Sequence, residues 1–159
     1  MLRVSKLTDY ATVILTHIGH DPMKLHAATD ITKATGVALP TVSKVLKKLT
    51  KEAILKSHRG PKGGYMLAKL PAETNVAQVI SAIEGPISMT ECSSDESACE
   101  QEASCEIKAN WGLINRAVFT ALEAVSLADL IAPANQQLVN LSLPSEINKD
   151  MSDDFKVEK

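Results

Sequence analysis

The three cysteines of the chain lie close together in the sequence, at Cys92, Cys99 and Cys105. They are separated by six and then five residues, and the segment from Glu91 to Glu106 otherwise holds Ser, Ala, Gln and carboxylates. This composition is typical of an exposed loop. Thiolates bind zinc, copper(I) and iron–sulfur clusters, and an odd cysteine count argues against a purely structural set of disulfides. The pattern indicates a metal or cluster site with a fourth ligand from elsewhere; a loop of free thiols and a redox disulfide remain alternatives.

The composition favours a globular protein with one domain and an appendage. The chain has 159 residues, of which 45% are hydrophobic and only 3% aromatic. No apolar run approaches the roughly 20 residues that span a bilayer, and the N-terminal sequence MLRVSKLTDYA is too polar for a signal peptide. We therefore expect a cytoplasmic protein with no membrane partner, in which cysteines more often bind metal or react than form permanent bridges.

The charge is distributed unevenly along the chain. Residues 1–70 contain twelve Lys and Arg against four acids, a balance of +8, whereas residues 71–159 contain five bases against fifteen acids, a balance of −10. A nearly neutral total that combines opposite halves suggests that the first half binds a polyanion and the second half does something else.

The basic half begins with a pattern typical of a helix-turn-helix. The first helix is expected over Leu7–Gly19, because apolar residues recur there at helical spacing. A short helix over Ala28–Thr35 should end at Gly36, and a second should carry Pro40 in its first turn and run to about Lys51. Two helices joined by a short turn containing Gly form a helix-turn-helix. The second helix would bury one face and leave a cationic, hydrogen-bonding face outward; the buried face is Val42, Val45, Leu46 and Leu49.

A small strand hairpin is expected directly after these helices. Ala53–Ser57 and Tyr65–Leu67 have strand character, and the sequence HRGPKGG between them is typical of a turn. A hairpin after a helix-turn-helix is the order of a winged helix, in which one helix enters the major groove of double-stranded DNA and the wing follows the backbone. We predict that Thr41, Ser43 and Lys44 contact base edges, and that phosphates are contacted by Lys47, Lys48, Arg59 and Lys62.

The acidic half contains a long helix that we predict to form a homodimer. A short helix over Asn75–Ile83 should precede the cysteine loop, and a long one should run from about Glu106 to Val125. A helix of this length could pack on its own domain, but because that small domain already has a core, we expect the helix to pack on a second subunit. Its apolar stripe, the predicted dimer contact, is Trp111, Ile114, Val118, Leu122 and Val125.

These elements predict a mainly α protein with a small β wing, of the α+β class. Residues 1–85 would form the winged helix-turn-helix DNA-binding domain and residues 86–106 the cysteine loop. Residues 107–131 would form the dimerisation helix and a short terminal helix, which a capping box at Ser126–Asp129 starts. Residues 132–159 would be a polar tail, with its last part disordered.

Several motifs together resemble the IscR and NsrR family of bacterial winged-helix regulators. They are SKLTDYA near the N-terminus, the turn GVALPTVSK, the wing RGPKGGYML, the sequence VISAIEG and the triple-cysteine loop. Within that family the chain looks most similar to regulators of the SUF system for iron–sulfur cluster assembly. The resemblance, which runs from Met1 to about Ile131, implies a homodimer crossed through the long helices and an iron–sulfur cluster, either 2Fe–2S or 4Fe–4S, held by Cys92, Cys99 and Cys105.

The resemblance suggests Asp9 as the fourth ligand. IscR-type members use a histidine shortly after the third cysteine, but this chain has Lys108 there and no histidine nearby. NsrR-type members use an aspartate from the first helix of the partner subunit, and Asp9 of the SKLTD sequence matches it. Glu106 and a water molecule are the alternatives.

Two classes of function follow. The first is a transcription regulator, with no enzymatic activity, whose DNA affinity depends on its cluster. A zinc-binding or thiol-redox sensor of the same fold is a variant of it. The second is an iron–sulfur electron-transfer or cluster-carrier protein, which would need the cysteine loop but no winged helix or basic half.

Overall fold

Three helices open the fold, in a computed structural model that describes residues 4–90, 105 and 107–133. They are α1 (Lys6–His20), α2 (Ala28–Thr35) and α3 (Leu39–Lys51). Gly36 ends α2 with a φ of 72°, a left-handed conformation that glycine adopts without a steric penalty. Only residues 36–38 separate α2 from α3. The helix-turn-helix is thus confirmed at the positions that the sequence predicts.

Helix α1 lies at the centre of the hydrophobic core. It packs against α2, α3, α4 and α6, and its residues Ala11, Ile14, Leu15 and Ile18 are fully buried. The four predicted core residues of α3 are also fully buried. Tyr10, which the helical periodicity places on the apolar side of α1, instead lies at the edge of the buried face and is 37% exposed.

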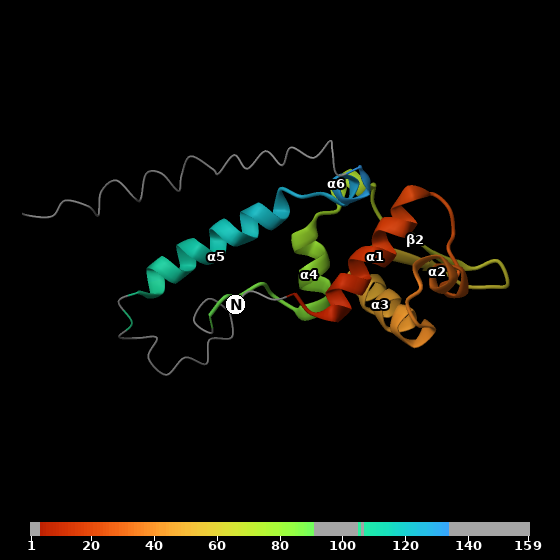
Figure 1. The fold of residues 1–159 in the computed structure, drawn as a ribbon, viewed down its shortest axis with the longest axis horizontal. Coiled ribbons are helices and arrows are strands. Elements are labelled where there is room, and N and C mark those ends of the chain that lie inside the picture. The colour runs from red at the N-terminus through yellow and green to blue at the C-terminus, as the bar shows by residue number, and fades with distance from the viewer. Residues whose placement is uncertain (1–3, 91–104, 106, 134–159) are drawn as a thin grey trace, which may run out of the picture.

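The wing consists of two antiparallel strands, β1 (Leu55–His58) and β2 (Gly64–Leu67), in which His58 pairs with Gly64. Strand β1 begins two residues later than predicted. Ala53 adopts a left-handed conformation with a φ of 55°, and the amide of Ile54 donates to the Leu49 carbonyl at 2.9 Å. These two residues therefore close α3 instead of extending the strand. The wing points away from the rest of the molecule, opposite α5 (Figure 1).

The second half of the described chain comprises a short 3-10 helix, η1 (Pro71–Glu73), and three α-helices. These are α4 (Val76–Glu84), α5 (Lys108–Glu123) and α6 (Leu127–Ile131). Helix α5 ends before Val125, because the Val125 carbonyl accepts a hydrogen bond from the Val76 amide at 2.9 Å. The predicted capping box starts α6, with the Ser126 hydroxyl accepting from the Asp129 amide.

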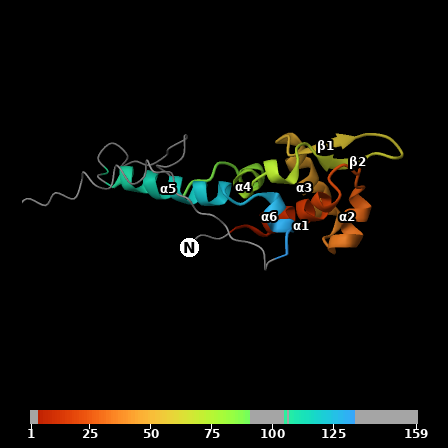
Figure 2. The same cartoon turned by 90° about the horizontal axis from the view of Figure 1, so that it is seen from above.

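Helix α6 packs on the N-terminal domain. Leu127 is 1% exposed and belongs to the same core as α1, and Figure 2 shows α6 beside that helix. Ile131 lies so close to Gly19 that a Cβ at residue 19 would come within 2.5 Å of its Cδ1 atom. The division of the chain into segments remains a prediction. The short terminal helix nevertheless contributes to the core of the N-terminal domain.

Helix α5 extends away from this core (Figures 1 and 2). It packs mainly against α4, and none of its residues is fully buried. Ile114, on the predicted dimer stripe, is 44% exposed. A long helix with an exposed apolar stripe is typical of a surface that another chain covers. Among the described residues, no helix has the length and apolar character needed to cross a membrane.

Candidate nucleic-acid interface and ligand-binding cysteines

The outer face of α3 carries the residues predicted to contact DNA. Its buried side is held by four core residues, so Ser43, Lys44 and Lys47 are exposed and Thr41 is half-buried. Arg59 and Lys62 are exposed at the tip of the wing. The structure therefore leaves these six side chains accessible from two elements, a helix that can enter a groove and a hairpin that can follow a backbone.

Strand β2 of the wing is fixed to the loop before α2. His26 and Tyr65 exchange two backbone hydrogen bonds of 2.9 Å, and His26 Nε2 lies 3.1 Å from the Asp21 carbonyl. The ring of His17 meets the His26 ring edge-on at 5.4 Å between centroids. Burial, and then the charge of a protonated His26, lower the pKa of His17. Protonation of His17 is therefore disfavoured where the wing is attached.

Replacing Gly64 with Ala should destabilise the attachment of the wing. A Cβ at residue 64 would lie 2.8 Å from the His26 carbonyl oxygen, so β2 would have to move away from that loop. Overpacking of this kind costs about 1–3 kcal/mol of unfolding free energy. Gly112→Ala in α5 is the control, because nothing lies within 4 Å of its added Cβ. Urea unfolding should give a lower midpoint for Gly64→Ala only; equal midpoints would contradict this role.

Lys48 has a different environment from the exposed lysines of α3. It is half-buried, and its ammonium donates to the Ile83 carbonyl of α4 at 2.5 Å. The predicted phosphate contact of Lys48 is therefore in competition with an interaction inside the protein.

Asp9, the candidate fourth ligand, is exposed in the first turn of α1. It lines an open groove together with Thr12 of the same helix, Ile80 of α4 and Leu122 near the end of α5. Its carboxylate is accessible to a ligand or to another chain.

Of the three cysteines, the structure describes Cys105. It is half-buried just before α5, and its carbonyl accepts from the Lys108 amide at 3.3 Å. Cys92 and Cys99, most of the loop, the alternative ligand Glu106 and the tail from residue 134 lie outside the described residues. The described residues contain no group of three or more His, Cys, Asp or Glu placed to bind a metal.

Cys105 and Asp9 lie near opposite ends of α5. Cys105 precedes its first turn, whereas Asp9 shares a groove with Leu122, one residue before its end. With 16 residues at about 1.5 Å each, α5 is about 24 Å long. The two candidate ligands of one chain are therefore too far apart to bind a single small cluster.

The predicted dimer stripe is accessible along α5. Ile114 is exposed, whereas Trp111, Val118, Leu122 and Val125 are half-buried. The stripe thus keeps apolar surface uncovered along most of the helix.

Sequence periodicity missed one polar contact in this region. Glu84, the last residue of α4, accepts hydrogen bonds from the Ser5 amide at 3.0 Å and from the Thr8 hydroxyl. Nothing in the spacing of these residues indicates that they meet, because about 80 residues separate the two ends of the contact. The sequence VISAIEG, one of the motifs of the resemblance, contains Glu84.

The chain is similar to known regulators over most of its length. A family model described as Rrf2, iron-dependent transcriptional regulator, matches residues 4–133. The HTH-type transcriptional regulator IscR of Aliivibrio salmonicida is 29% identical over 127 residues, which cover 80% of this chain and 73% of that protein.

Two solved structures have the same fold. CymR, the global cysteine regulator of B. subtilis, has a TM-score of 0.64 at 25% identity and matches 82% of this chain and 97% of that one. IscR of T. potens has a TM-score of 0.63 at 22% identity, with 86% and 92% covered. The family match, the exposed face of α3 and the wing lead to the same conclusion, and the predicted fold class is confirmed. The chain belongs to the Rrf2 family and is a transcriptional regulator with a DNA-binding winged helix.

Proposed function

We propose that this regulator binds DNA in a manner that depends on an iron–sulfur cluster, 2Fe–2S or 4Fe–4S. Cys92, Cys99 and Cys105 of one subunit and Asp9 of the other would hold the cluster. Three thiolates and a carboxylate suit iron, and a carboxylate is more easily replaced than a fourth thiolate. When bound, the cluster would supply a group that reacts with oxidants or nitric oxide.

The observation that carries this proposal is the placement of Cys105 and Asp9 at opposite ends of α5. In a two-fold symmetric pair of crossed, antiparallel helices, the start of one α5 lies near the end of its partner. Cys105 of one chain would then approach Asp9 of the other. The exposed stripe on α5 and the open groove beside Asp9 both support this pairing.

We further propose that the targets are genes for iron–sulfur cluster assembly of the SUF type. The similarity to IscR and the sequence motifs support this choice. Anaerobic reconstitution followed by iron and sulfide analysis tests the cofactor, and affinity for DNA from upstream of such genes, with and without the cluster, tests the regulation. Zinc without sulfide would favour the zinc-sensor alternative, and an affinity that ignores the cluster would reject the proposal.

On the DNA side, Thr41, Ser43 and Lys44 would contact bases, whereas Lys47, Arg59 and Lys62 would contact phosphates. Each lost phosphate contact should reduce the slope of log affinity against log salt by about one unit, for specific and non-specific DNA alike. We expect this result for Lys47→Ala and Arg59→Ala in titrations at several salt concentrations. Arg116→Ala, an exposed base on α5, should leave the slope unchanged. Unchanged slopes in the first two variants would contradict this docking.

A further inference from the structure

The C-terminal end of α4 contacts both α1 and α3. The Glu84 Oε1 atom accepts from the Ser5 amide at 3.0 Å and from the Thr8 hydroxyl, which fixes the first turn of α1. One residue earlier, the Ile83 carbonyl accepts from the Lys48 ammonium of α3 at 2.5 Å. Two adjacent residues of α4 therefore hold two helices that are otherwise far apart in the sequence.

The chemistry of these contacts makes them costly to lose. Thr8 is only 1% exposed. If Glu84 moved away or were replaced, the Thr8 hydroxyl would lose its carboxylate acceptor at a buried position. The hydrogen bonds from Thr8 and Ser5, together with the nearby charge of Lys48, lower the pKa of the Glu84 carboxyl group. Glu84 therefore stays ionised at neutral pH, and its hydrogen bonds are of the stronger, charge-assisted kind.

The joined helices carry the residues that matter for the proposed function. Thr8 directly precedes Asp9, and Lys48 directly follows Lys47 on the DNA-binding helix. Beyond Glu84, the chain turns at Gly85, with a φ of 96°, and leads through Met89 towards the cysteines. The Met89 amide donates to Asn115 Oδ1 of α5 at 3.1 Å. The segment that follows α4 thus contacts α5 in space and leads to the cysteine loop in sequence.

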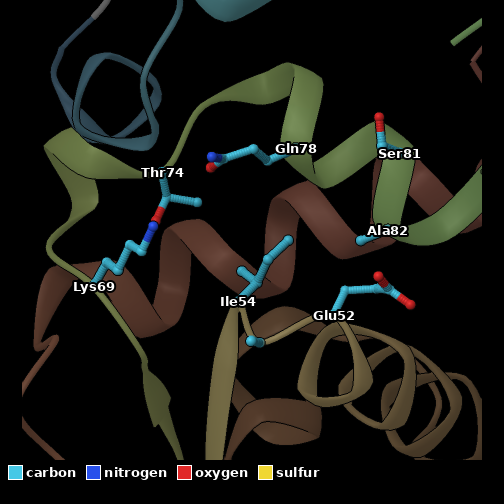
Figure 3. A pocket seen from close by; sticks show the side chains of 8 residues that line it. Glu52, Ile54, Lys69, Thr74, Gln78, Ser81 and Ala82 are labelled. Carbon is cyan, nitrogen blue, oxygen red and sulfur yellow. The ribbon is translucent and has the colours of Figure 1, made fainter. Parts of the chain in front are cut away.

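Helix α3 is not packed against α4 along its whole length. A hollow of about 310 Å³ lies between the C-terminal end of α3 and α4, with Glu52 and Lys69 on opposite sides and Ser81 of α4 at its rim (Figure 3). The hollow is a gap in the packing between α4 and this end of α3. The bond from Lys48 to Ile83 is a polar connection between the two helices, one residue away from Ala82, which lines the gap.

We propose that Glu84 and Lys48 are positioning residues that transmit the state of the ligand site to the DNA-binding helix. A displacement of Asp9, or of the chain after Gly85, would move the end of α4 through Glu84 and move α3 through Lys48. The proposal rests on the proposed cluster-dependent binding. It assigns Lys48 a role inside the protein that differs from the phosphate contacts of its neighbours.

The decisive measurement is the ratio of operator affinities with and without the cluster. Lys48→Met keeps the aliphatic stem but removes the donor to Ile83, so we expect the ratio to fall to about 1 from the fivefold or more that is typical of coupled sites. Absorption spectrum and dimerisation should not change. Lys47→Met, the matched control, should weaken both forms alike and keep the ratio. Lys48→Met overturns the proposal if it behaves like Lys47→Met, with an unchanged ratio and a smaller salt slope.

A second measurement does not depend on the cluster. Glu84→Ala should raise amide hydrogen exchange in the first turn of α1 and also in α3 around Lys48, because both are held through the end of α4. Faster exchange confined to α1 would overturn the connection even in a protein with normal cluster-dependent binding. Conversely, a wild-type affinity ratio of 1 with this exchange pattern would reject the proposed function and leave the connection intact.

Discussion

Val118→Asp should convert the dimer into monomers and abolish tight operator binding. Val118 lies in the middle of the α5 stripe, so a symmetric pair would bury two unpaired carboxylates near its axis. An uncompensated buried charge costs roughly 3–5 kcal/mol, which weakens dimerisation by about a hundredfold or more. Sedimentation velocity at micromolar concentration would show the loss directly. Operator affinity should fall as the dimer is lost, because each monomer would then bind its half-site alone.

The control is Ala109→Asp, which adds the same charge to an exposed position on the opposite side of α5. This variant should remain a dimer. If Val118→Asp also sediments as a dimer, the subunits meet on another surface, and the pairing of Cys105 with the partner's Asp9 loses its basis.

Replacing any one of Cys92, Cys99 and Cys105 with Ser should abolish the visible chromophore after anaerobic reconstitution. An alcohol is a poor ligand for iron in a cluster, so each loss should remove the site and not merely weaken it. Cluster-dependent DNA binding should disappear, with the affinity ratio falling to about 1. Asp9→Ala should have a smaller effect and leave a labile or spectrally altered cluster.

Asp30→Ala is the matched control for Asp9→Ala. Asp30 is also an exposed acid in the first turn of a helix, so both substitutions remove the same favourable interaction with the helix dipole. Only Asp9→Ala should change the spectrum. If Asp9→Ala equals the wild type in spectrum, stability and DNA response, another group is the fourth ligand. Colourless wild-type protein would reject the cluster itself.

The parts of the fold that depend on local chemistry could be predicted from the sequence. Gly36 and Pro40 mark the turn of the helix-turn-helix, and the Ser126–Asp129 capping box marks the start of α6. Each of these signals acts within a few residues, so no knowledge of the tertiary structure is required. The apolar face of α3 follows in the same way from its 3.6-residue period.

Features that depend on contacts between distant segments could not be predicted. Periodicity gives Tyr10 an inward position, but the neighbouring helices decide how wide the buried face of α1 becomes. In the sequence, Lys48 is one of several lysines that predict a solvent-exposed face. Only the tertiary packing of α4 brings its ammonium to the Ile83 carbonyl. Thr8 and Glu84 lie in the motifs SKLTDYA and VISAIEG, but nothing in either motif indicates that the two residues meet, or that their contact fixes the turn of α1 next to Asp9.

The burial of Leu127 against α1 also bears on how the protein is made. The core of the DNA-binding domain includes a residue more than 100 positions after Ile18, so that core cannot close until α6 has left the ribosome. Contacts of such long sequence separation form late and slow folding. We expect a nascent chain that ends before α6 to have an incomplete core around α1. Because α5 precedes α6 in the sequence, the finished domain would appear only when the helix for pairing has already been made.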